Sequence, residues 1–591
     1  MSLYARRTRT RLALILALPF LSASAQRAPN LGPNVLLVSP STPREDAQAK
    51  INAIYATQQH NEFGSQRNAI LFTRGDYKLD LPIGFYTSVI GLGATPDAVH
   101  ITGNVHVDAA SRNNNATTTF WRSAEGFSIT PTGGEKNRAM QWAVSQAVPF
   151  RRMHVRGDIV LHQHDGWASG GWMSDARVDG SVNSGPQQQW ISRNSEWASW
   201  TGSNWNMVFV GVPHPPAGDW PKLAYTKVEH TPIIREKPFL EVDATGHWSV
   251  RVPSLKTDTT GITWAAGTTE GSSIPLARFY IAHPDTDTAA TINAQLARGK
   301  HLLFTPGIYD LTEPIRITRA HTVILGLGFA TLHPTRGTPA MTTDDVDGLT
   351  IAGLLFDAGP QESPVLLEVG PPNSKATHTK DPSALFDVFF RVGGAGEGRT
   401  QSNLTLNSSD VIVDHTWIWR ADHGHNVGWD QNTSRNGLIV NGDRVTIYGL
   451  FVEHHQQYQV LWNGNGGRTY FYQSEIPYDP PTQTAYTSAP STAGAGQTDG
   501  WAAYKLAPSV TTHEAWGLGI YSVFTHPDIF VTRAIEVPQL PGIRFHDMIT
   551  VCLASKGGIR NIIDDTGGST SCGSPRVEPR LTSFPSTEHA Q

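Results

Sequence analysis

The sequence predicts an all-β protein made of two tandem parallel β-helix domains in one chain. Three observations predict this fold. A segment near the N-terminus recurs roughly 235 residues later, short strand-like runs follow each copy, and no long amphipathic helix interrupts those runs. Composition agrees, because charged residues make up only 16% of the 591 residues while there are 55 glycines and 39 prolines. Such a composition is typical of a β-rich, turn-rich chain.

The first 25 residues have the pattern of a secretory signal peptide. Arginines precede the apolar run LALILALPFL, which is shorter than the roughly 20 residues that span a bilayer. Ala23-Ser24-Ala25 then matches an A-x-A cleavage pattern. We therefore expect a secreted, extracellular protein. No later run is long and apolar enough to predict a membrane span.

The repeated segment opens each half of the remaining chain. The letters INA, FT, G-x-Y and GLG occur in this order from Ile51, and they recur in the same order from Ile292. Both copies therefore predict a helical segment, a strand, a tight turn and a second strand. We interpret this as an internal duplication that gives two similar domains.

Short strands that alternate apolar and polar residues continue each copy, and comparable strands are spaced by about twenty-odd residues. This spacing is typical of the coils of a parallel β-helix, in which each coil stacks on the next. A β-sandwich, with strands every 8–12 residues or so, is the competing interpretation. The predicted division is a signal peptide (1–25), an N-terminal β-helix (26–212), an inter-domain connection (213–275), a C-terminal β-helix (276–551) and a tail (552–591).

The two cysteines, Cys552 and Cys572, both lie near the C-terminus. In a secreted protein they could pair and pin the tail down. Two free thiols are the alternative. Neither cysteine lies in a His/Asn pattern that would indicate a nucleophile.

Two glutamates in the second half, Glu453 and Glu475, are 22 residues apart, which is about one coil. In register, their carboxyl groups would stack at roughly the ~4.8 Å spacing of strands. Close carboxylates raise each other's pKa, and an acid that stays protonated can protonate a glycosidic oxygen. Two unrelated surface carboxylates are the alternative. Aromatic residues that could form platforms for sugar rings surround the pair: Tyr458, Trp462, Tyr470, Tyr472 and Tyr478.

Three motifs resemble glycoside hydrolase family 55: QSEIPY from Gln473 to Tyr478, QQQWISRN in the first half and EAWGLGIYS near the end. The resemblance spans nearly the whole mature chain. It implies two right-handed parallel β-helices of the pectin-lyase-like type and an inverting β-1,3-glucanase activity. It also implies that Glu475 is the general acid and that Glu453 supports it. Since carboxyl groups only about 5 Å apart are typical of retaining enzymes, we interpret Glu453 as a group that tunes Glu475, not as the base.

The resemblance further implies that polar side chains of the first domain hold the attacking water, in a groove between the domains. The candidates for holding water or substrate are Gln187, Gln188, Gln189 and Asn194, then Gln146, Ser169 and Ser203, with Trp462, Tyr472 and Tyr478 among the aromatic residues. Two features depart from the family. The first half is unusually rich in tryptophan, and the motif reads Ser-Glu-Ile where Thr-Glu-Thr is expected. These departures concern the surroundings of the sugar, so its identity and linkage stay open.

Other polar clusters have weaker patterns. His162 and His164 in HQHDGW, which Asp165 follows, would lie on one face of a strand and could ligate a metal, but no third ligand is evident, so we expect a loop. The acidic run TTDDVDG (342–348) resembles a calcium loop only loosely and is interpreted as a solvated turn. The segment 420–430, which contains Asp422 and His423, would either line the groove or pack in the core. Glu196 and Glu514 are further acids. We predict no metal and no cofactor.

The sequence therefore predicts a secreted glycoside hydrolase that acts on β-glucan, and the resemblance favours the β-1,3 linkage. A polysaccharide lyase and a non-catalytic carbohydrate-binding β-helix are the alternatives. Lyases need a cationic base and often calcium, which the formal net charge of −5 and the glutamate pair disfavour. The same charge argues against nucleic acid and anionic membranes as partners. We expect a polysaccharide or oligosaccharide substrate and a monomer.

Overall fold

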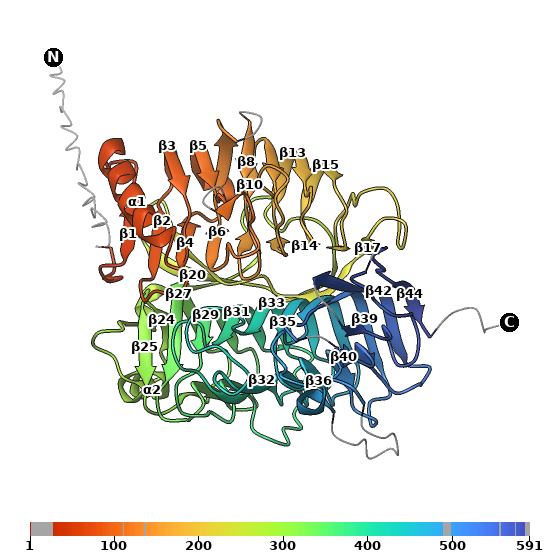
Figure 1. Ribbon diagram of the computed structural model, residues 1–591. Coiled ribbons are helices and arrows are strands. Elements are labelled where there is room, and N and C mark those ends of the chain that lie inside the picture. Colours follow the sequence, from red (N-terminus) through yellow and green to blue (C-terminus); the bar gives the residue numbers. More distant parts are fainter. Residues whose placement is uncertain are drawn as a thin grey trace.

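Two parallel β-helices lie side by side along their length in the computed structural model (Figure 1). The structure describes residues 1, 28–109, 112–134, 138–488, 498–526, 528–554, 557–573 and 575–585. Apart from Met1, the predicted signal peptide lies outside the described residues. Within the described ranges, no helix has the length and apolar character needed to cross a membrane.

The N-terminal domain wraps two parallel sheets around one apolar core. The first sheet contains β1 (Val35–Val38), β2 (Asn68–Phe72), β4 (Thr87–Gly91), β6 (Arg122–Glu125), β9 (Pro149–Arg151), β12 (Trp172–Ser174), β14 (Gln189–Arg193), β16 (Asn206–Val210) and β17 (Tyr225–Val228). The second contains β3 (Gly75–Pro82), β5 (Val99–His106), β7 (Ser128–Pro131), β10 (His154–Val155), β13 (Arg177–Asn183), β11 (Asp158–Val160) and β8 (Ala139–Gln141), and β15 (Glu196–Thr201) pairs with β13. The predicted boundary at residue 212 is too early, because β17 continues the first sheet to Val228.

The C-terminal domain repeats this architecture. Its long sheet contains β23 (Phe279–Ala282), β24 (His301–Phe304), β27 (Val323–Pro334), β29 (Thr350–Asp357), β31 (Ala384–Val392), β33 (Ile412–Arg420), β35 (Thr446–Glu453), β37 (Gly467–Glu475), β39 (His513–Val523), β42 (Ile543–Ala554) and β44 (Arg580–Phe584), and β25 (Ile308–Leu311) pairs with β27. The opposite sheet contains β26 (Ile315–Ile317), β28 (Met341–Thr343), β30 (Leu367–Val369), β32 (Thr400–Leu406), β34 (Ser434–Val440), β36 (Val460–Trp462), β38 (Tyr504–Leu506) and β41 (Ile535–Glu536), and β40 (Phe530–Val531) pairs with β43 (Gly558–Ile559). The predicted tail is not separate, because β44 pairs antiparallel with β42.

The duplicated segment forms the same helix and turn at the start of both domains. Its helix, α1 (Arg44–Gln58) in the first copy and α2 (Ala289–Ala297) in the second, covers the first coil with a fully buried isoleucine, Ile51 or Ile292. In the turn that follows, Tyr77 donates to the carbonyl of its own turn at 2.7 Å, and Tyr309 does so at 3.0 Å. The repeat therefore encodes the capped start of each β-helix.

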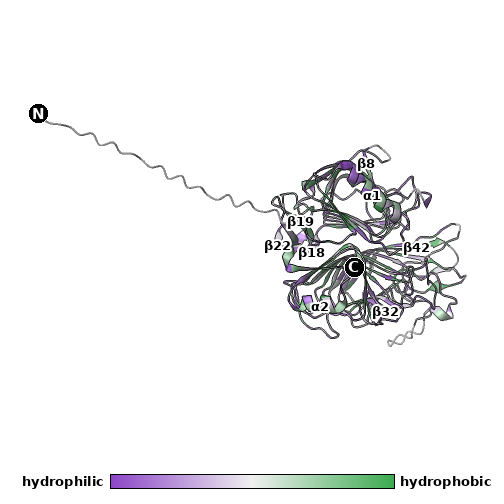
Figure 2. Cartoon of the chain, turned by 90° about the vertical axis from the view of Figure 1, so that its left-hand side faces the viewer, coloured by the Kyte–Doolittle hydropathy of each residue, from purple (hydrophilic) through white to green (hydrophobic). Residues whose placement is uncertain are grey.

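The two domains pack sheet against sheet, as the end-on view shows (Figure 2). The first N-terminal sheet faces the long C-terminal sheet, with β2 and β4 beside β27 and β16 beside β37 and β39. Apolar side chains from both sheets form a shared core between them. At Gly449 (φ +64°) a Cβ would lie 2.5 Å from the ring of Trp172, so the sheets approach more closely there than a larger residue permits.

The connection between the domains runs back along the N-terminal domain. It forms two small antiparallel sheets, one of β18 (Thr231–Ile234) and β21 (Lys256–Thr259), the other of β19 (Phe239–Val242), β20 (Trp248–Pro253) and β22 (Gly271–Pro275). Successive residues of the connection contact successively earlier coils of the first domain. Thr231 donates to Asn194 at 2.6 Å, Lys237 to Glu125 at 2.7 Å, and the Val242 amide to the Leu92 carbonyl at 2.8 Å. The second domain therefore starts beside the start of the first (Figure 1).

A buried ionic cluster joins the two domains and the connection. Arg151 of the first domain contacts Asp387 at 2.8 Å and Asp414 at 2.6 Å in the second. Arg193 contacts Asp414 at 2.9 Å and Glu236 of the connection at 2.6 Å. All five side chains are buried. Burial alone would oppose ionisation, but the neighbouring cations outweigh it and lower the pKa of Asp387.

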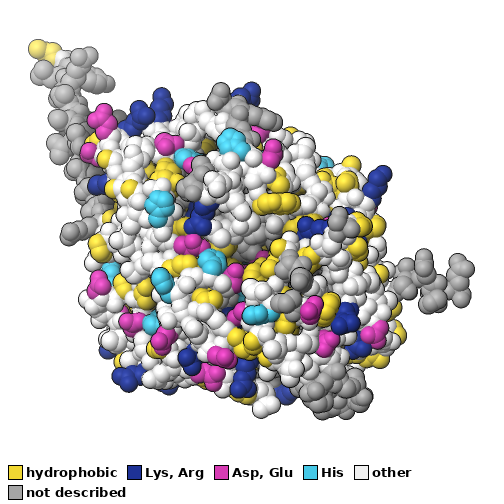
Figure 3. Space-filling view, viewed as in Figure 1, with side chains coloured by type: hydrophobic (Ala, Val, Ile, Leu, Met, Phe, Trp, Pro, Cys, Tyr) yellow, Lys and Arg dark blue, Asp and Glu magenta, His cyan; other side chains and the backbone are white. Residues whose placement is uncertain are grey.

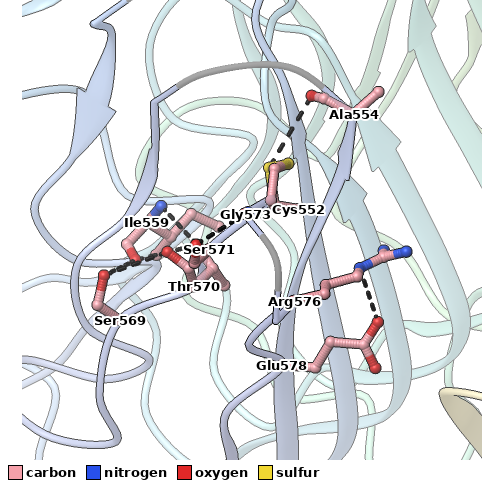
Figure 4. Close-up of a disulfide and its surroundings, with 10 residues drawn as sticks. Cys552, Ala554, Ile559, Ser569, Thr570, Ser571, Gly573, Arg576 and Glu578 are labelled. Carbon is pink, nitrogen blue, oxygen red and sulfur yellow. Dashed lines mark hydrogen bonds and ion pairs between the residues drawn. A yellow bond between two sulfur atoms is a disulfide. The ribbon is translucent and has the colours of Figure 1, made fainter.

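The tail is fixed by a disulfide between Cys552 and Cys572, whose Cα atoms are 5.3 Å apart (Figure 4). Of the two alternatives left open by the sequence, the structure shows the paired form. Beyond the bridge, Arg576 and Glu578 form an ion pair at 3.0 Å. The disulfide therefore holds the chain end beside the last strands of the long sheet.

We expect Arg151→Met to lower the free energy of unfolding by about 3–5 kcal/mol, because two aspartates would then lose a buried partner. Urea denaturation followed by tryptophan fluorescence measures the change. Arg435→Met, at an exposed position of β34, is the matched control and should change stability by less than about 0.5 kcal/mol. Equal losses in the two variants would contradict a structural role for the cluster.

Candidate active site

A column of left-handed residues decides which side chains of the long sheet face the N-terminal domain. One such residue occurs in each of seven strands, with φ between +49° and +78°: Gly353, Asp387, His415, Gly449, Phe471, Gly517 and Asp547. The strand pairing skips each of them. The inward–outward alternation restarts after the column, so in β37 Tyr472 points into the C-terminal core. Gln473 and Glu475 then point outward, to the other domain.

Beyond this column, one row of paired residues crosses four strands. Trp419 in β33 pairs with Glu453 in β35, Glu453 with Glu475 in β37, and Glu475 with Tyr521 in β39. The predicted stacking of the two glutamates is therefore present, with one coil between them. Both side chains face the N-terminal domain.

Side chains of both domains hold Glu453. Its Oε1 accepts a hydrogen bond from Gln146 Nε2 at 2.8 Å, and its Oε2 accepts one from Trp417 Nε1 at 2.8 Å. Ser169 Oγ donates in turn to Gln146 Oε1 at 3.1 Å. These hydrogen bonds favour the ionised form of Glu453, but burial outweighs them and raises its pKa.

Glu475 is held by residues of its own domain and is more accessible than Glu453. Tyr478 donates its hydroxyl to Oε2 of Glu475, and Gln473 Nε2 lies 3.3 Å from Oε1. Glu475 is 9% exposed, whereas Glu453 is 2% exposed. Glu475 is therefore the member of the pair that can reach a ligand.

A cavity of about 220 Å³ opens in front of the two glutamates, between the domains. The N-terminal domain lines it with Thr117, Thr118, Phe120, Gln146, Ser169 and Gln188. The C-terminal domain adds Trp417, Trp419, Asp422, His423, His454, Tyr478 and Leu553 around the pair. Figure 3 shows histidine and acidic side chains gathered at the junction of the two domains. Flat aromatic walls and polar groups in one small cavity suit a sugar ring.

The two carboxyl groups titrate as a pair. Burial raises the pKa of Glu475 to about 7, and Asp422 adds to this shift while the Tyr478 hydroxyl opposes it. Burial and the neighbouring Glu475 raise the pKa of Glu453 well above its ordinary value. The two protonation steps therefore belong to the pair and not to either residue alone. Glu475 is the more exposed member, so a proton shared by the pair reaches a ligand through it.

A chain of charges forms the wall beside the pair. His423 lies between Asp422 at 2.8 Å and Glu62 at 2.9 Å, and Glu62 also contacts Arg112 at 2.8 Å. These carboxylates outweigh the effect of burial and raise the pKa of His423 to about 10. Burial likewise opposes ionisation of Asp422, but His423 and His454 lower its pKa to about 2. Asp422 is therefore an anion whose field keeps a proton on the glutamate pair.

Several predicted site residues lie elsewhere. Tyr472 faces the interior of the C-terminal domain, because the alternation restarts after the left-handed column. Trp462 packs in the same core from β36, which belongs to the opposite sheet. Asn194 holds the connection through Thr259 and Gly261, both at 3.1 Å, and the Ser203 hydroxyl accepts from the amide of Ala224 at 2.9 Å. These four residues do not line the cavity in front of the glutamate pair.

The glutamine run divides among three roles. Gln187 is fully buried and bonds to backbone carbonyls inside the first domain, and it accepts from the Gly170 amide at 2.7 Å. Gln188 lines the cavity. Gln189 bonds to the Ser169 carbonyl at 3.0 Å and so lies behind the cavity wall. Of the less favoured candidates, Gln146 bonds to Glu453 and Ser169 bonds to Gln146.

No group of three or more His, Cys, Asp or Glu side chains that could hold a metal ion is found in the described part of the chain. The acidic run at 342–348 binds a histidine instead, since Asp345 and Asp347 contact His378 at 2.9 and 2.7 Å. Sequence reasoning missed Phe120, His454 and Leu553 in the cavity wall. None of them lies in a recognisable motif.

A stacked carboxyl pair, with one raised pKa near neutrality and a sugar-sized cavity between two parallel β-helices, defines a class of protein: glycoside hydrolases that work by acid catalysis. Comparisons with known proteins identify the family. Residues 279–475 match the model of the LAM55 pectate lyase-like domain, and the match ends on Glu475.

The full-length relatives agree. The exo-beta-1,3-glucanase of Streptomyces sp. (strain SirexAA-E / ActE) is 47% identical over 559 residues, which are 94% of this chain and 90% of that protein. The structure of sacteLam55A from Streptomyces sp. SirexAA-E superposes with a TM-score of 0.90 at 46% identity, covering 94% of this chain and 99% of that one. A variant of sacteLam55A in complex with glucose gives the same values. The chain belongs to glycoside hydrolase family 55.

The pKa of Glu475 predicts the alkaline limit of activity. Since the acid must be protonated, kcat/KM should fall as pH rises through about 7. Tyr478→Phe removes a hydrogen bond that lowers this pKa. The alkaline limb of the kcat/KM profile of this variant should therefore move to higher pH by about half a unit or more. Asp422→Asn removes a charge that raises the pKa of Glu475, so the alkaline limb of its profile should move to lower pH. Shifts of both variants in one direction would contradict this account of the site.

Proposed function

We propose that this protein is a secreted exo-β-1,3-glucanase that removes glucose from a chain end with inversion at the anomeric carbon. The 47% identical relative is named an exo-beta-1,3-glucanase, and a related structure holds glucose. The observation that carries the mechanism is the contact across the domain interface, in which Gln146 bonds to Glu453 one coil away from Glu475.

In this proposal Glu475 is the general acid. It donates its proton to the glycosidic oxygen as the bond to the anomeric carbon breaks. Its raised pKa keeps it protonated near neutral pH, and its exposure to the cavity allows contact with the oxygen. Asp422 favours the protonated state before the reaction, since it is a fixed anion on the same wall.

The attacking water lies, in this proposal, against Ser169 and Gln146 on the opposite wall. Its proton passes along their hydrogen bonds toward Glu453, which is the titratable member of that group. Glu453 does not act as a nucleophile, because both of its oxygens are already hydrogen-bonded and only 2% of the residue is exposed. Attack by water from the side opposite the leaving group inverts the anomeric carbon.

The size of the cavity supports action at a chain end. Its volume of about 220 Å³ lies below the roughly 300–1,000 Å³ of sites for larger ligands. A cavity of this size suits one sugar ring, not a long stretch of polymer. The signal-peptide pattern and the disulfide support secretion, because disulfides persist in oxidising compartments.

Digestion of β-1,3-glucan tests the reaction. We expect α-glucose as the first product, seen by proton NMR before mutarotation, and no product from β-1,4-, β-1,6- or α-linked glucans. Initial β-glucose would contradict the inverting mechanism. Unsaturated sugars that absorb in the ultraviolet would indicate a lyase.

Glu475→Gln should lower kcat by about two to four orders of magnitude, because the proton donor is lost. Glu514→Gln is the matched control: Glu514 lies on β39, pairs with His546 at 3.0 Å and does not line the cavity. Its activity should stay within twofold of wild type. An active Glu475→Gln enzyme would contradict the assignment of Glu475 as the general acid.

A further inference from the structure

One irregular residue near the end of β42 reaches the cavity. Cys552 pairs with Ser522 of β39 and Ala554 pairs with Val523, so the strand pairing skips Leu553. A β-bulge of this kind bends the strand and re-aims a side chain, and bulges are common beside active sites. The skipped residue, Leu553, lines the cavity in front of the two glutamates. The bulge therefore places an apolar side chain in the cavity wall.

Leu553 also packs on an apolar cluster to which both domains contribute. The cluster consists of Trp205, Trp220 and Ala224 from the first domain and Tyr521, Ile549 and Val551 from the second. Tyr521 is the strand neighbour of Glu475. The wall that Leu553 completes is therefore continuous with the packing between the domains.

The end of β42 that carries the bulge has a strand neighbour on one side. β44 pairs with β42 from Phe545 to Ile549, and the Thr550 amide donates to the Pro579 carbonyl at 3.3 Å. Among the described residues, no strand pairs with residues 551–554 on the side away from β39. Hydrogen bonds to one neighbouring strand leave the position of a bulge weakly determined, so this strand end needs another support.

The disulfide provides this support. Cys552, which directly precedes Leu553, is 2% exposed and is bonded to Cys572 (Figure 4). Cys572 follows Ser571, whose backbone exchanges hydrogen bonds with Val577 at 3.1 and 3.0 Å. The bulge is thus joined covalently to a segment that has its own backbone pairing.

The tail beyond the bridge is fixed on the first domain. Arg580 donates to the Pro221 carbonyl at 2.7 Å and lies over the ring of Trp220 at 5.5 Å. Arg576 lies over Trp205 at 5.4 Å. Both tryptophans belong to the cluster on which Leu553 packs. The bridge therefore connects the bulge to contacts made with both domains.

We infer that the Cys552–Cys572 disulfide is a positioning element of the active site, which holds the bulge so that Leu553 closes the cavity wall. The inference rests on the proposed function. Without the bridge, residues 551–554 keep their pairing with β39 alone, and the bulge is free to shift. Leu553 then leaves the wall, the sugar loses an apolar contact, and water enters the cavity. The bridge acts through Leu553 and does not touch the substrate.

The test removes the bridge without leaving a free thiol. In Cys552→Ser/Cys572→Ser, KM for β-1,3-oligosaccharides should rise about three- to tenfold, with kcat within about twofold at pH values where Glu475 is protonated. Leu553→Ala should raise KM about tenfold, and Leu553→Met, which keeps an apolar side chain of similar volume, should recover most of that loss. Val577→Ser, at an exposed position of the same tail, is the matched control and should leave both constants unchanged.

Two readouts separate positioning from a general loss of stability. Leu553→Ala added to the double cysteine variant should raise KM no further than Leu553→Ala alone, because the bridge acts through this residue. In the double cysteine variant the alkaline limb of kcat/KM should move to lower pH, because entering water weakens the burial that raises the pKa of Glu475. Additive effects on KM, or an unchanged KM and limb without the bridge, would overturn the inference.

Hydrogen exchange tests the support without any need for activity. The amides of residues 551–554 should exchange faster in the double cysteine variant than in wild type, while those of β35 keep their protection. Wild type reduced with dithiothreitol after folding gives the same comparison without a substitution. Equal exchange at residues 551–554 would contradict the role of the bridge. Failure of wild type to hydrolyse β-1,3-glucan would instead contradict the proposed function, and the exchange comparison would still test the bridge.

Discussion

The contact between two facing sheets is the constraint on which the site depends. Arg151 and Arg193 reach across it to Asp387 and Asp414, in a setting where an unpaired charge would be strongly destabilising. This requirement fixes how one β-helix lies along the other. With that register set, Gln146 of the first domain meets Glu453 of the second, and the cavity closes from both sides.

Within the second domain, a local backbone feature has an equally large effect. One left-handed residue per strand places two successive side chains on the outer face. In β33 the pair is Asp414 and His415, which belong to the ionic cluster or contact it, and the strand then presents Trp417 and Trp419 to the cavity. The same column therefore positions the structural charges and the row that contains Glu453 and Glu475. Substitutions that disturb the buried charges would therefore also disturb the row that contains the two glutamates, and the reverse holds as well.

The sequence anticipated the carboxyl pair because the coil length is regular there: 22 residues separate Glu453 from Glu475, and the strands pair without a shift beyond the column. It misplaced Trp462 because that residue lies on the opposite sheet, and it misplaced Tyr472 for a reason related to the column. Proximity in sequence says which strand a residue joins, but one extra residue in the strand reverses the face it occupies. Neither the motif nor the alternation of apolar residues reveals that extra residue.

The sequence by itself determined the two β-helices, their shared capped start and the pair of acids, because each follows from local pattern repeated at a regular spacing. Only the tertiary structure decided which polar residues of the first domain serve the site. Ser169 and Gln188 line the cavity while Asn194 and Ser203 do not, since this depends on how the coils of two domains line up. That alignment comes from packing and buried charge between residues more than two hundred positions apart, which no local pattern encodes.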